Sequence, residues 1–392
     1  MSRRTVIVYA KRTPIGKFCG ALANSSAPRL GAVLVKDLLQ SLPIKGEDIH
    51  EIIMGQVLTA GVGQAPARQT AIYGGLPTSV PATTINKVCG SGLKAVMLGE
   101  QAIARGDADI VIAGGQENMS QAPHLLMGSR SGFKFGPVEM RDHMQWDGLT
   151  DPYDNVAMGV CGEICAKEFK IGRAEQDEFA LNSYKRSRHA IEAGYFRDEI
   201  VGVELTVKNQ VSVVDRDEEP FSVDLAKIKT LRPAFDAQGT ITAGNASSLS
   251  DGAAMLVLME EELARKKGIK AIARILGSAM HAQEPTWFTT APIEGIRKAL
   301  LKTALQKNDI DLFEINEAFS VVPLIAMQKL GLSAEQVNIC GGAVSLGHPI
   351  GASGARILVT LIHTLHREKK KRGVASLCIG GGESCNLVVE SI

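Results

Sequence analysis

The stretch INKVCGSGLKAV, residues 85–96, sets a cysteine, Cys89, between a short apolar segment and a run of helix-forming residues that continues to Arg105. Gly90 and Gly92 allow close approach of the backbone, and a helix N-terminus favours a thiolate. We therefore predict that Cys89 is a nucleophile. The alternative is a buried structural cysteine, because free cysteine is among the most buried residue types.

The overall composition is that of a globular protein with more than one domain. The chain has 392 residues, of which 45% are hydrophobic and 22% are charged; this length favours two or three domains. The 43 Lys and Arg residues are balanced by 42 Asp and Glu residues, which argues against a nucleic-acid-binding protein. An anionic small substrate would need only a local basic cluster.

The seven cysteines and the absence of long apolar runs bear on location. An odd number of cysteines without a paired framework is typical of reduced thiols in the cytosol. The N-terminal residues lack a signal-peptide core, and no run approaches the roughly 18 apolar residues of a membrane span. We therefore expect a cytoplasmic protein that does not bind membranes.

Strands and helices alternate along the first 113 residues. We predict strands at residues 5–9, 52–58, 83–88 and 109–113, and helices at 28–41, 65–73 and 93–105. Such alternation indicates an α/β protein with a mostly parallel sheet that is covered on both faces.

We predict that the chain repeats its beginning after a long insertion. Residues 120–245 have a different sequence pattern, with a charged helix at 173–193 and an irregular charged segment at 208–233. We interpret them as an inserted lobe. Alternation returns with strands at 253–259 and 271–276, a helix at 292–305, a helix from 353 to 366 and a strand at 374–379. Two similar halves joined by an insertion explain this order better than chance similarity does.

Three stretches of the second half could complete a site around Cys89. GGAVSLGHPIGASG, residues 341–354, carries His348 on a glycine-rich loop before a helix, where it could serve as the base that a nucleophilic thiol needs. LCIGGGE, residues 377–383, sets Cys378 beside glycines whose N–H groups could bind an anion. Asn316, in EINEAFS at residues 314–320, is most simply a turn or cap residue.

Other kinds of site lack their signatures. Cys161 and Cys165 have no second Cys or His pair nearby, so a zinc site is not expected. The sequence contains no Walker A motif, no G-x-S-x-G motif, and no G-x-G-x-x-G motif after a strand.

Taken together, these stretches resemble the thiolase family, and its acetyl-CoA acetyltransferase branch in particular. The resemblance runs over essentially the whole chain and is strongest in four blocks: NKVCGSG from Asn86, NEAF from Asn316, GHPIGASGAR from Gly347 and CIGGG from Cys378. It implies two similar βαβαβαββ halves packed as a five-layered α-β-α-β-α sandwich with an inserted loop domain. The corresponding division is 1–119 and 249–270 for the first half, 120–248 for the loop domain and 271–392 for the second half.

The resemblance also implies roles for five residues. Cys89 would take the acyl group as a thioester, and His348 would activate it. His348 and a water held by Asn316 would stabilise a thioester oxyanion, and Cys378 would remove the α-proton of the second acetyl-CoA. The backbone N–H groups of Cys89 and Gly380 would form a second oxyanion site.

Contacts to coenzyme A are likewise implied by the resemblance. The loop domain would hold the nucleotide end at Ser222, Val223, Asp224 and Lys227, the pantetheine path at Tyr184 and Ser247, and the pocket walls at Phe235, Met158 and Phe288. Some relatives bind a monovalent cation near positions matching Tyr184, Ala243, Gly244, Ala246 and Val344. No other cofactor and no metal is expected.

Two positions depart from the family pattern. Many relatives have His-Met-Gly where this chain has Ala157, Met158 and Gly159, and they often carry a small or apolar residue at Glu383. Neither departure removes a catalytic group.

The expected reaction is the reversible Claisen condensation of two acetyl-CoA to acetoacetyl-CoA and CoA, with ping-pong kinetics. A degradative 3-ketoacyl-CoA thiolase is the alternative within the family, and a non-catalytic acyl-CoA-binding relative is the alternative outside catalysis. A ketosynthase-like enzyme is disfavoured, because that branch has a second His where Cys378 stands. Family members are commonly homotetramers, with residues 121–141 contributing to assembly.

Overall fold

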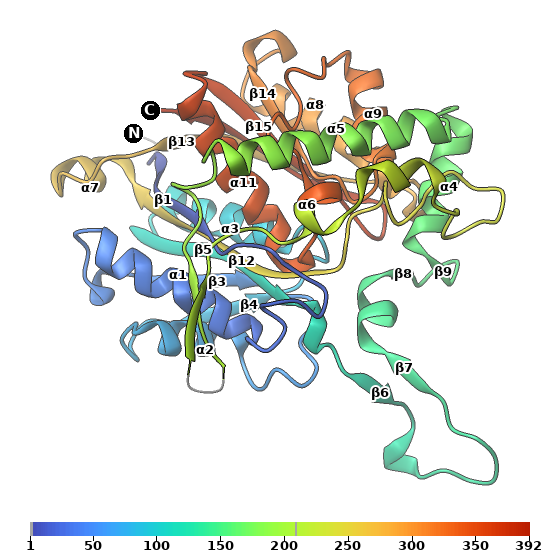
Figure 1. Ribbon diagram of the computed structural model, residues 1–392. Coiled ribbons are helices and arrows are strands. Elements are labelled where there is room, and N and C mark those ends of the chain that lie inside the picture. Colours follow the sequence, from blue (N-terminus) through green and yellow to red (C-terminus); the bar gives the residue numbers. More distant parts are fainter. Residues whose placement is uncertain (1–2, 208–209) are drawn as a thin grey trace.

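The computed structural model describes residues 3–207 and 210–392 and contains one mixed ten-stranded sheet (Figure 1). Its first group of strands runs in the order β1 (Thr5–Arg12), β12 (Ser250–Glu260), β5 (Ile110–Asn118), β3 (Glu51–Gly55) and β4 (Ala82–Ile85). The second group runs β13 (Ala273–Ala282), β16 (Glu383–Ser391), β15 (Arg372–Ile379) and β14 (Leu312–Ile315). A short β2 (Gly16–Lys17) pairs with β12.

The two groups repeat one pattern and meet at a narrow seam. β1 and β13 pair only at Val6 with Arg274 and at Ile7 with Ala273. The outward order β13, β16, β15, β14 repeats β1, β12, β5, β3, and a parallel bridge from Phe313 to Val337 stands where β4 pairs in the first group. The prediction of two similar halves is thereby confirmed.

The expectation of a mostly parallel sheet is wrong. Only β3 with β4, β3 with β5, and β14 with β15 run parallel among the pairs of the two groups, and the other pairs are antiparallel. The reason lies in the connections, since β16 follows β15 through a tight turn and β12 follows β5 after the long insertion. Neither connection is the helical crossover that parallel strands need.

Helices complete five layers. α1 (Ala27–Ser41) and α2 (Pro66–Gly74) pack on the outer face of the first group, and α8 (Ala291–Lys302) and α9 (Val321–Leu330) on the outer side of the second. α3 (Ser91–Arg105) and α11 (Ile350–Arg367) lie between the two groups. Alternate residues of β12 bear this out: Leu256 faces the central core and Val257 the outer one. The α-β-α-β-α fold implied by the resemblance is therefore confirmed.

Glycines let the two central helices touch near their N-termini. A Cβ on Gly92 of α3 would lie 2.8 Å from the backbone N of Ala355, and one on Gly354 of α11 would lie 2.4 Å from the backbone N of Leu93. Any side chain would push the helices apart. Because Cys89 and His348 directly precede these helices, this close packing brings their loops together.

The segment between β5 and β12 carries many short elements. They are β6 (His124–Leu126), β7 (Met140–Asp142), β8 (Thr150–Asp151), β9 (Val156–Ala157), β10 (Val203–Val207), β11 (Gln210–Val214), α4 (Met158–Glu168), α5 (Arg173–Glu192) and α6 (Glu219–Ser222). Two further short helices, α7 (Glu261–Lys266) and α10 (Ala343–Leu346), lie outside it. The segment predicted to be irregular at 208–233 contains β11 and α6, and its residues 208–209 lie outside the described ones. The domain boundaries given above stay a prediction.

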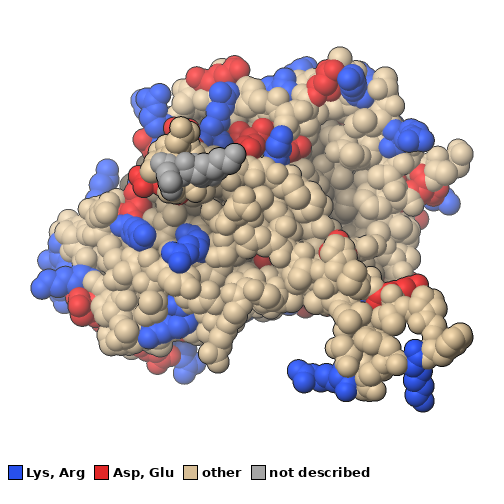
Figure 2. Space-filling view, turned by 60° about the horizontal axis from the view of Figure 1, so that its bottom comes forward, with Lys and Arg blue, Asp and Glu red and all other residues tan. Residues whose placement is uncertain are grey.

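An arm, residues 121–141, projects from the body of the molecule and includes β6 and most of β7 (Figures 1 and 2). It exposes large apolar side chains, among them Leu126, Met127, Phe133, Phe135, Val138 and Met140. In the part of the chain that the structure describes, we find no helix with the length and hydropathy of a membrane span.

Two strands are shorter than predicted, for a reason that matters for the site. The strand predicted at 52–58 ends at Gly55, because the backbone N–H groups of Val57 and Leu58 donate to the carboxylate of Glu117 (3.0 and 3.1 Å). The strand predicted at 83–88 ends at Ile85, and Val88 adopts a left-handed conformation with φ +47°. The strand predicted at 109–113 instead continues to Asn118.

We predict that Arg12→Met strongly destabilises the fold. The Arg12 guanidinium is fully buried and donates to Glu199 (2.6 Å) and to both carboxylate oxygens of Asp217 (2.7 and 2.9 Å). Removing it leaves two buried carboxylates uncompensated, which costs about 3–5 kcal/mol. Chemical denaturation measures the loss. An unchanged free energy of unfolding would contradict the prediction, and Glu262→Gln, at an exposed ion pair with Arg265, is the control.

Candidate functional site

The Cys89 loop is a tight turn held by the first residue of α3. The hydroxyl of Ser91 accepts from the backbone N–H of Lys87 (2.8 Å) and donates to the carbonyl of Val88 (2.7 Å). The left-handed Val88 is unfavourable for a β-branched residue, and such strain is concentrated at functional sites. The turn leaves Cys89 partly exposed as a residue, although its thiol is buried.

The His348 loop fixes which ring nitrogen carries the proton. The hydroxyl of Ser353 donates to the carbonyl of Pro349 (2.9 Å), so its only proton is used there. With the serine proton assigned to the carbonyl of Pro349, the contact of 2.6 Å between Nδ1 of His348 and the Ser353 oxygen is a hydrogen bond donated by Nδ1. Nε2 is left as an unprotonated acceptor, and it has no partner among the described residues.

Burial keeps this imidazole neutral. Desolvation, and after it the positive charge of Arg356, lowers the pKa of His348 to about 3. At neutral pH the ring can therefore accept a proton at Nε2, which is what a base for a thiol requires.

Cys378 and Gly380 come from β15 and the turn that follows it. Burial raises the pKa of Cys378 well above its ordinary value, and the neighbouring Cys89 raises it further, so the two thiols are close. Burial also raises the pKa of Cys89 to about 11. The backbone N–H of Gly380 lowers this pKa, but its effect is smaller than that of burial. The expectation that a helix N-terminus favours the thiolate of Cys89 is therefore wrong in this structure, and a base is needed.

Asn316 directly follows β14 and is buried. Its backbone N–H donates to the carbonyl of Ser376 (2.9 Å), and its side-chain oxygen accepts from the guanidinium of Arg356 (3.4 Å). The side-chain nitrogen has no partner among the described residues. Asn316 is thus more than the turn residue that its sequence context favours, because it offers a buried donor.

Two adjoining cavities contain the thiol and the imidazole. The inner one, about 50 Å³, has room for a few water molecules. It is lined by Val88, Cys89, Gly148, Leu149, Met158, Ser247, Phe288, Ala318, Phe319, His348, Ile350 and Gly380. A channel of about 360 Å³ shares Met158, Ser247, Phe319 and His348 with it and continues along Phe235, Thr242 and Ala243. The arrangement suits a long, narrow substrate whose end reaches Cys89.

The structure brings some of the expected contact residues together and leaves others apart. Met158, Phe235, Ala243 and Ser247 line the channel, and Phe288 closes the inner cavity. Ser222, Asp224 and Lys227 are exposed on α6 and the turn after it, with Lys227 3.7 Å from Asp224. Tyr184 is buried in an apolar cluster with Ile228 and Val344, against which Val223 packs, and it does not line the channel.

The positions named for a monovalent cation are similarly divided. Ala243 and Ala246 line the channel, whereas Tyr184 and Val344 lie in the apolar cluster and Gly244 packs against Leu231. Ala157 lines the channel without a polar side-chain atom. Over residues 3–207 and 210–392, no group of three or more His, Cys, Asp or Glu side chains could hold a metal ion.

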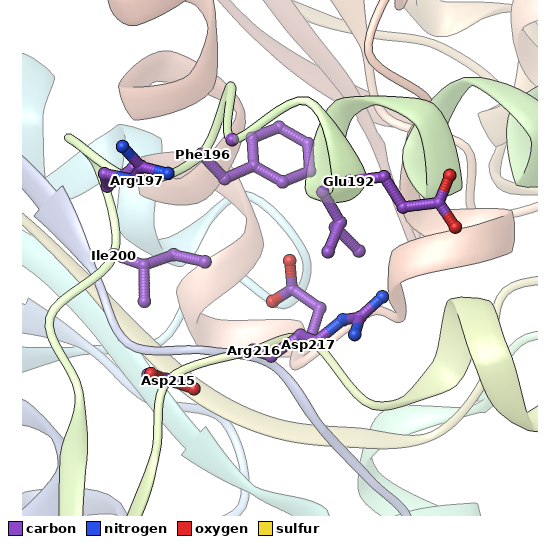
Figure 3. A pocket seen from close by; sticks show the side chains of 9 residues that line it. Glu192, Phe196, Arg197, Ile200, Asp215, Arg216 and Asp217 are labelled. Atoms are coloured by element: carbon purple, nitrogen blue, oxygen red, sulfur yellow. The ribbon is translucent and has the colours of Figure 1, made fainter.

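A larger hollow, about 560 Å³, lies at the end of α5, and it is a poor candidate for catalysis (Figure 3). Its lining includes Glu192, Arg197 and Arg216 but neither a thiol nor an imidazole. The carboxylate of Asp217, drawn near its centre, is already bonded to Arg12. We therefore assign the site to the cavity at Cys89.

Three residues that sequence reasoning missed support the site. Ser353 sets the tautomer of His348, Arg356 orients Asn316, and Glu117 accepts from the backbone N–H groups of Val57, Leu58 and Gly351 (2.9 Å for the last). Ser353 and Arg356 lie in the GHPIGASGAR block, so the motif marked their region as functional. It did not reveal which residues they contact. Glu117 lies at the end of a buried strand, and no sequence pattern pointed to its role.

Comparisons with known proteins agree with this geometry. Residues 5–262 match the family described as thiolase, N-terminal domain, and residues 269–391 match thiolase, C-terminal domain. An acetyl-CoA acetyltransferase of Chromobacterium violaceum is 51% identical to this chain over 389 residues, which cover 98% of both chains. An acetyl-CoA acetyltransferase of Cupriavidus necator is 50% identical over 387 residues, which also cover 98% of both chains. The crystal structure of the Bacillus anthracis acetyl-CoA acetyltransferase superposes with a TM-score of 0.97 at 39% identity, covering 100% of this chain and 99% of that one.

Proposed function

Because this chain belongs to the thiolase family, we propose that it is an acetyl-CoA C-acetyltransferase, which joins two acetyl-CoA into acetoacetyl-CoA and CoA reversibly. The observation that carries the proposal is the inner cavity, where the thiol of Cys89, the imidazole of His348 and the N–H of Gly380 meet at the end of a channel.

In the first half-reaction, the sulfur of Cys89 attacks the carbonyl carbon of acetyl-CoA. Nε2 of His348 accepts the thiol proton and passes it to the departing CoA thiolate, so a thioester on Cys89 replaces the thioester of CoA. The backbone N–H groups of Cys89 and Gly380 would donate to the oxyanion of the tetrahedral intermediate.

In the second half-reaction, the thiol of Cys378 gives its proton to Nε2 of His348, which is free again, and the resulting thiolate removes the α-proton of another acetyl-CoA. The resulting carbanion attacks the acetyl carbonyl, a C–C bond forms and the C–S bond to Cys89 breaks; the proton on Nε2 of His348 then moves to the sulfur of Cys89, and Cys378 keeps the α-proton as its thiol. Acetylation of Cys89 favours this step, because it removes one of the three causes that raise the pKa of Cys378. Nε2 of His348, which carries a proton at this stage, and a water on Asn316 would donate to the enolate oxygen, which fits the unpartnered buried nitrogens of both residues.

Coenzyme A would lie in the channel and extend to the exposed segment at Lys227. Phe235, Met158 and Ser247 would border the pantetheine, and Ser222, Val223, Asp224 and Lys227 the nucleotide end, with the Lys227 cation suited to a phosphate. Tyr184 would not touch coenzyme A; it would support Val223 by packing against it. A monovalent cation near Ala243 and Ala246 remains part of the proposal, and equal rates in potassium and sodium buffers would count against it.

A degradative 3-ketoacyl-CoA thiolase is the second candidate, and one observation favours it. A hollow of about 520 Å³ beyond Met158 shares Val88, Gly148 and Gly380 with the inner cavity and could take longer chains. Phe288 and the small inner cavity favour the acetyl group instead. Thiolysis rates with 3-ketoacyl-CoA of increasing chain length distinguish the two candidates. We expect the highest rate at four carbons, and parallel double-reciprocal lines. A highest rate at longer chains would favour the second candidate.

We predict that Ser353→Ala slows acetylation of Cys89 by about tenfold. Without the Ser353 oxygen, Nδ1 of His348 loses its acceptor and the proton is free to occupy Nε2, the position that must accept the thiol proton. Rapid-quench kinetics with acetyl-CoA measure the rate. Ser353→Thr keeps the hydroxyl and is the matched control; a rate equal to wild type in Ser353→Ala would refute this role.

We propose that the protein is a cytoplasmic homotetramer assembled through the arm. The apolar side chains exposed on residues 126–140 have the character of an interaction surface, and a second copy of the chain is the proposed occupant. His124 pairs with Asp142, so a short linker can replace residues 125–141. We predict that light scattering gives about four times 41.8 kDa for wild type and half that mass for the deletion. An identical mass for both would contradict the role of the arm.

A further inference from the structure

An ion pair joins the two catalytic loops beside the site. Nζ of Lys87, two residues before Cys89, contacts the carboxylate of Glu383, three residues after Gly380. Both side chains are partly buried, with 28% and 31% of their surfaces exposed. The pair connects residues 296 positions apart, one from each half of the molecule.

Each partner is anchored on one side and adjoins strained or flexible backbone on the other. The N–H of Lys87 is bonded to Ser91 at the start of α3, and Val88 after it is left-handed. Glu383 begins β16 and pairs with both Ile379 and Ala282, whereas Gly381 and Gly382 before it have φ +90° and +82°. The glycine turn is held at both ends by the sheet and also at Gly382, whose carbonyl accepts from the backbone N–H of Gln283 (2.9 Å), while a Cβ on Gly381 at the tip would have no described heavy atom within 4 Å.

The contact that depends on this tip is between Gly380 and Cys89, which line the same inner cavity; the N–H of Gly380 lowers the pKa of the Cys89 thiol there. A Cβ placed on Gly380 would lie 3.8 Å from Val88 and 3.5 Å from Met158, so the two loops touch here without interlocking. The charges of Lys87 and Glu383 span the same gap. We infer that this pair is a positioning device, which holds the N–H of Gly380 against the Cys89 sulfur.

The role of the pair in catalysis rests on the proposed function, but its effect on the Cys89 sulfur does not. A hydrogen bond from Gly380 lowers the pKa of Cys89, so loosening it makes the thiolate rarer and alkylation slower. The same N–H would stabilise the oxyanion in acetyl transfer. Alkylation of Cys89 by iodoacetamide and acetylation by acetyl-CoA therefore report on one contact, and only the second needs the enzyme to be a thiolase.

The test compares Lys87→Met, Glu383→Gln and the exchange Lys87→Glu/Glu383→Lys with wild type. We expect each single variant to slow both reactions about three- to fivefold, the range open to a partly exposed ion pair, with KM for CoA and the melting temperature unchanged. The exchange should restore at least half of the loss. Salt at about 1 M should slow wild type and leave the single variants unaffected.

Glu262→Gln, which removes an exposed ion pair with Arg265, should match wild type in both reactions. Single variants within twofold of wild type in alkylation, or an exchange no faster than the slower single variant, would overturn the inference. If wild type is alkylated but never acetylated, the proposed function fails; the alkylation rates of the variants still decide the role of the pair.

Discussion

Cys89→Ala should lower the rate of acetoacetyl-CoA thiolysis by at least about 10⁴-fold, the loss typical of removing a covalent nucleophile. Cys89 is the only thiol among the lining residues of the inner cavity, and Cys378, a neighbour of Cys89 in β15, is buried with a pKa raised well above its ordinary value. The thioester therefore has no second place to form. The assay follows the decrease in acetoacetyl-CoA enolate absorbance at saturating CoA.

The matched control is Cys19→Ser, since Cys19 is an exposed cysteine outside the site. It should retain the rate of wild type. Binding of CoA to Cys89→Ala, measured by calorimetry, should also persist, because the channel is lined by other residues. Residual thiolysis within tenfold of wild type would mean that Cys89 is not the nucleophile.

Cys378→Ala should lower steady-state turnover by about 10²–10⁴-fold, the contribution of a general base, while Cys89 is still acetylated. The two steps separate because only the second one removes a carbon-bound proton. Exchange of deuterium into the methyl group of acetyl-CoA measures that step directly. We expect the exchange to disappear in Cys378→Ala.

Cys165→Ala is the control for this variant, since Cys165 is another buried thiol of the same apolar cluster as Cys378. It should keep both the exchange and the turnover. Loss of Cys89 acetylation in Cys378→Ala, with the fold intact, would contradict the separation of roles.

The fold could be predicted from sequence because its halves repeat their motifs in one order. The strand and helix around Cys89 and those around Cys378 were placed correctly in outline, since hydrophobic runs bounded by glycine mark them. Strand direction was wrong, because pairing in β12 and β16 depends on connections that local patterns do not reveal. The early end of β3 depends on Glu117, a residue sixty positions away from Val57.

The site could be predicted only in part, for a similar reason. Cys89, His348 and Gly380 lie in recognisable blocks and meet in one cavity. The raised pKa of Cys89 could not be foreseen, because burial is a property of the folded chain and here outweighs the backbone N–H groups that lower the pKa. Glu383 was visible in sequence only as a departure, and its partner Lys87 emerged from the structure.

Intact-protein mass spectrometry after brief exposure to acetyl-CoA tests the central claim most directly. We expect an adduct of about 42 Da, one acetyl group, on wild type and on Cys378→Ala, and none on Cys89→Ala. No adduct on wild type, with CoA still bound, would contradict the covalent mechanism and favour a protein that binds acyl-CoA without catalysis.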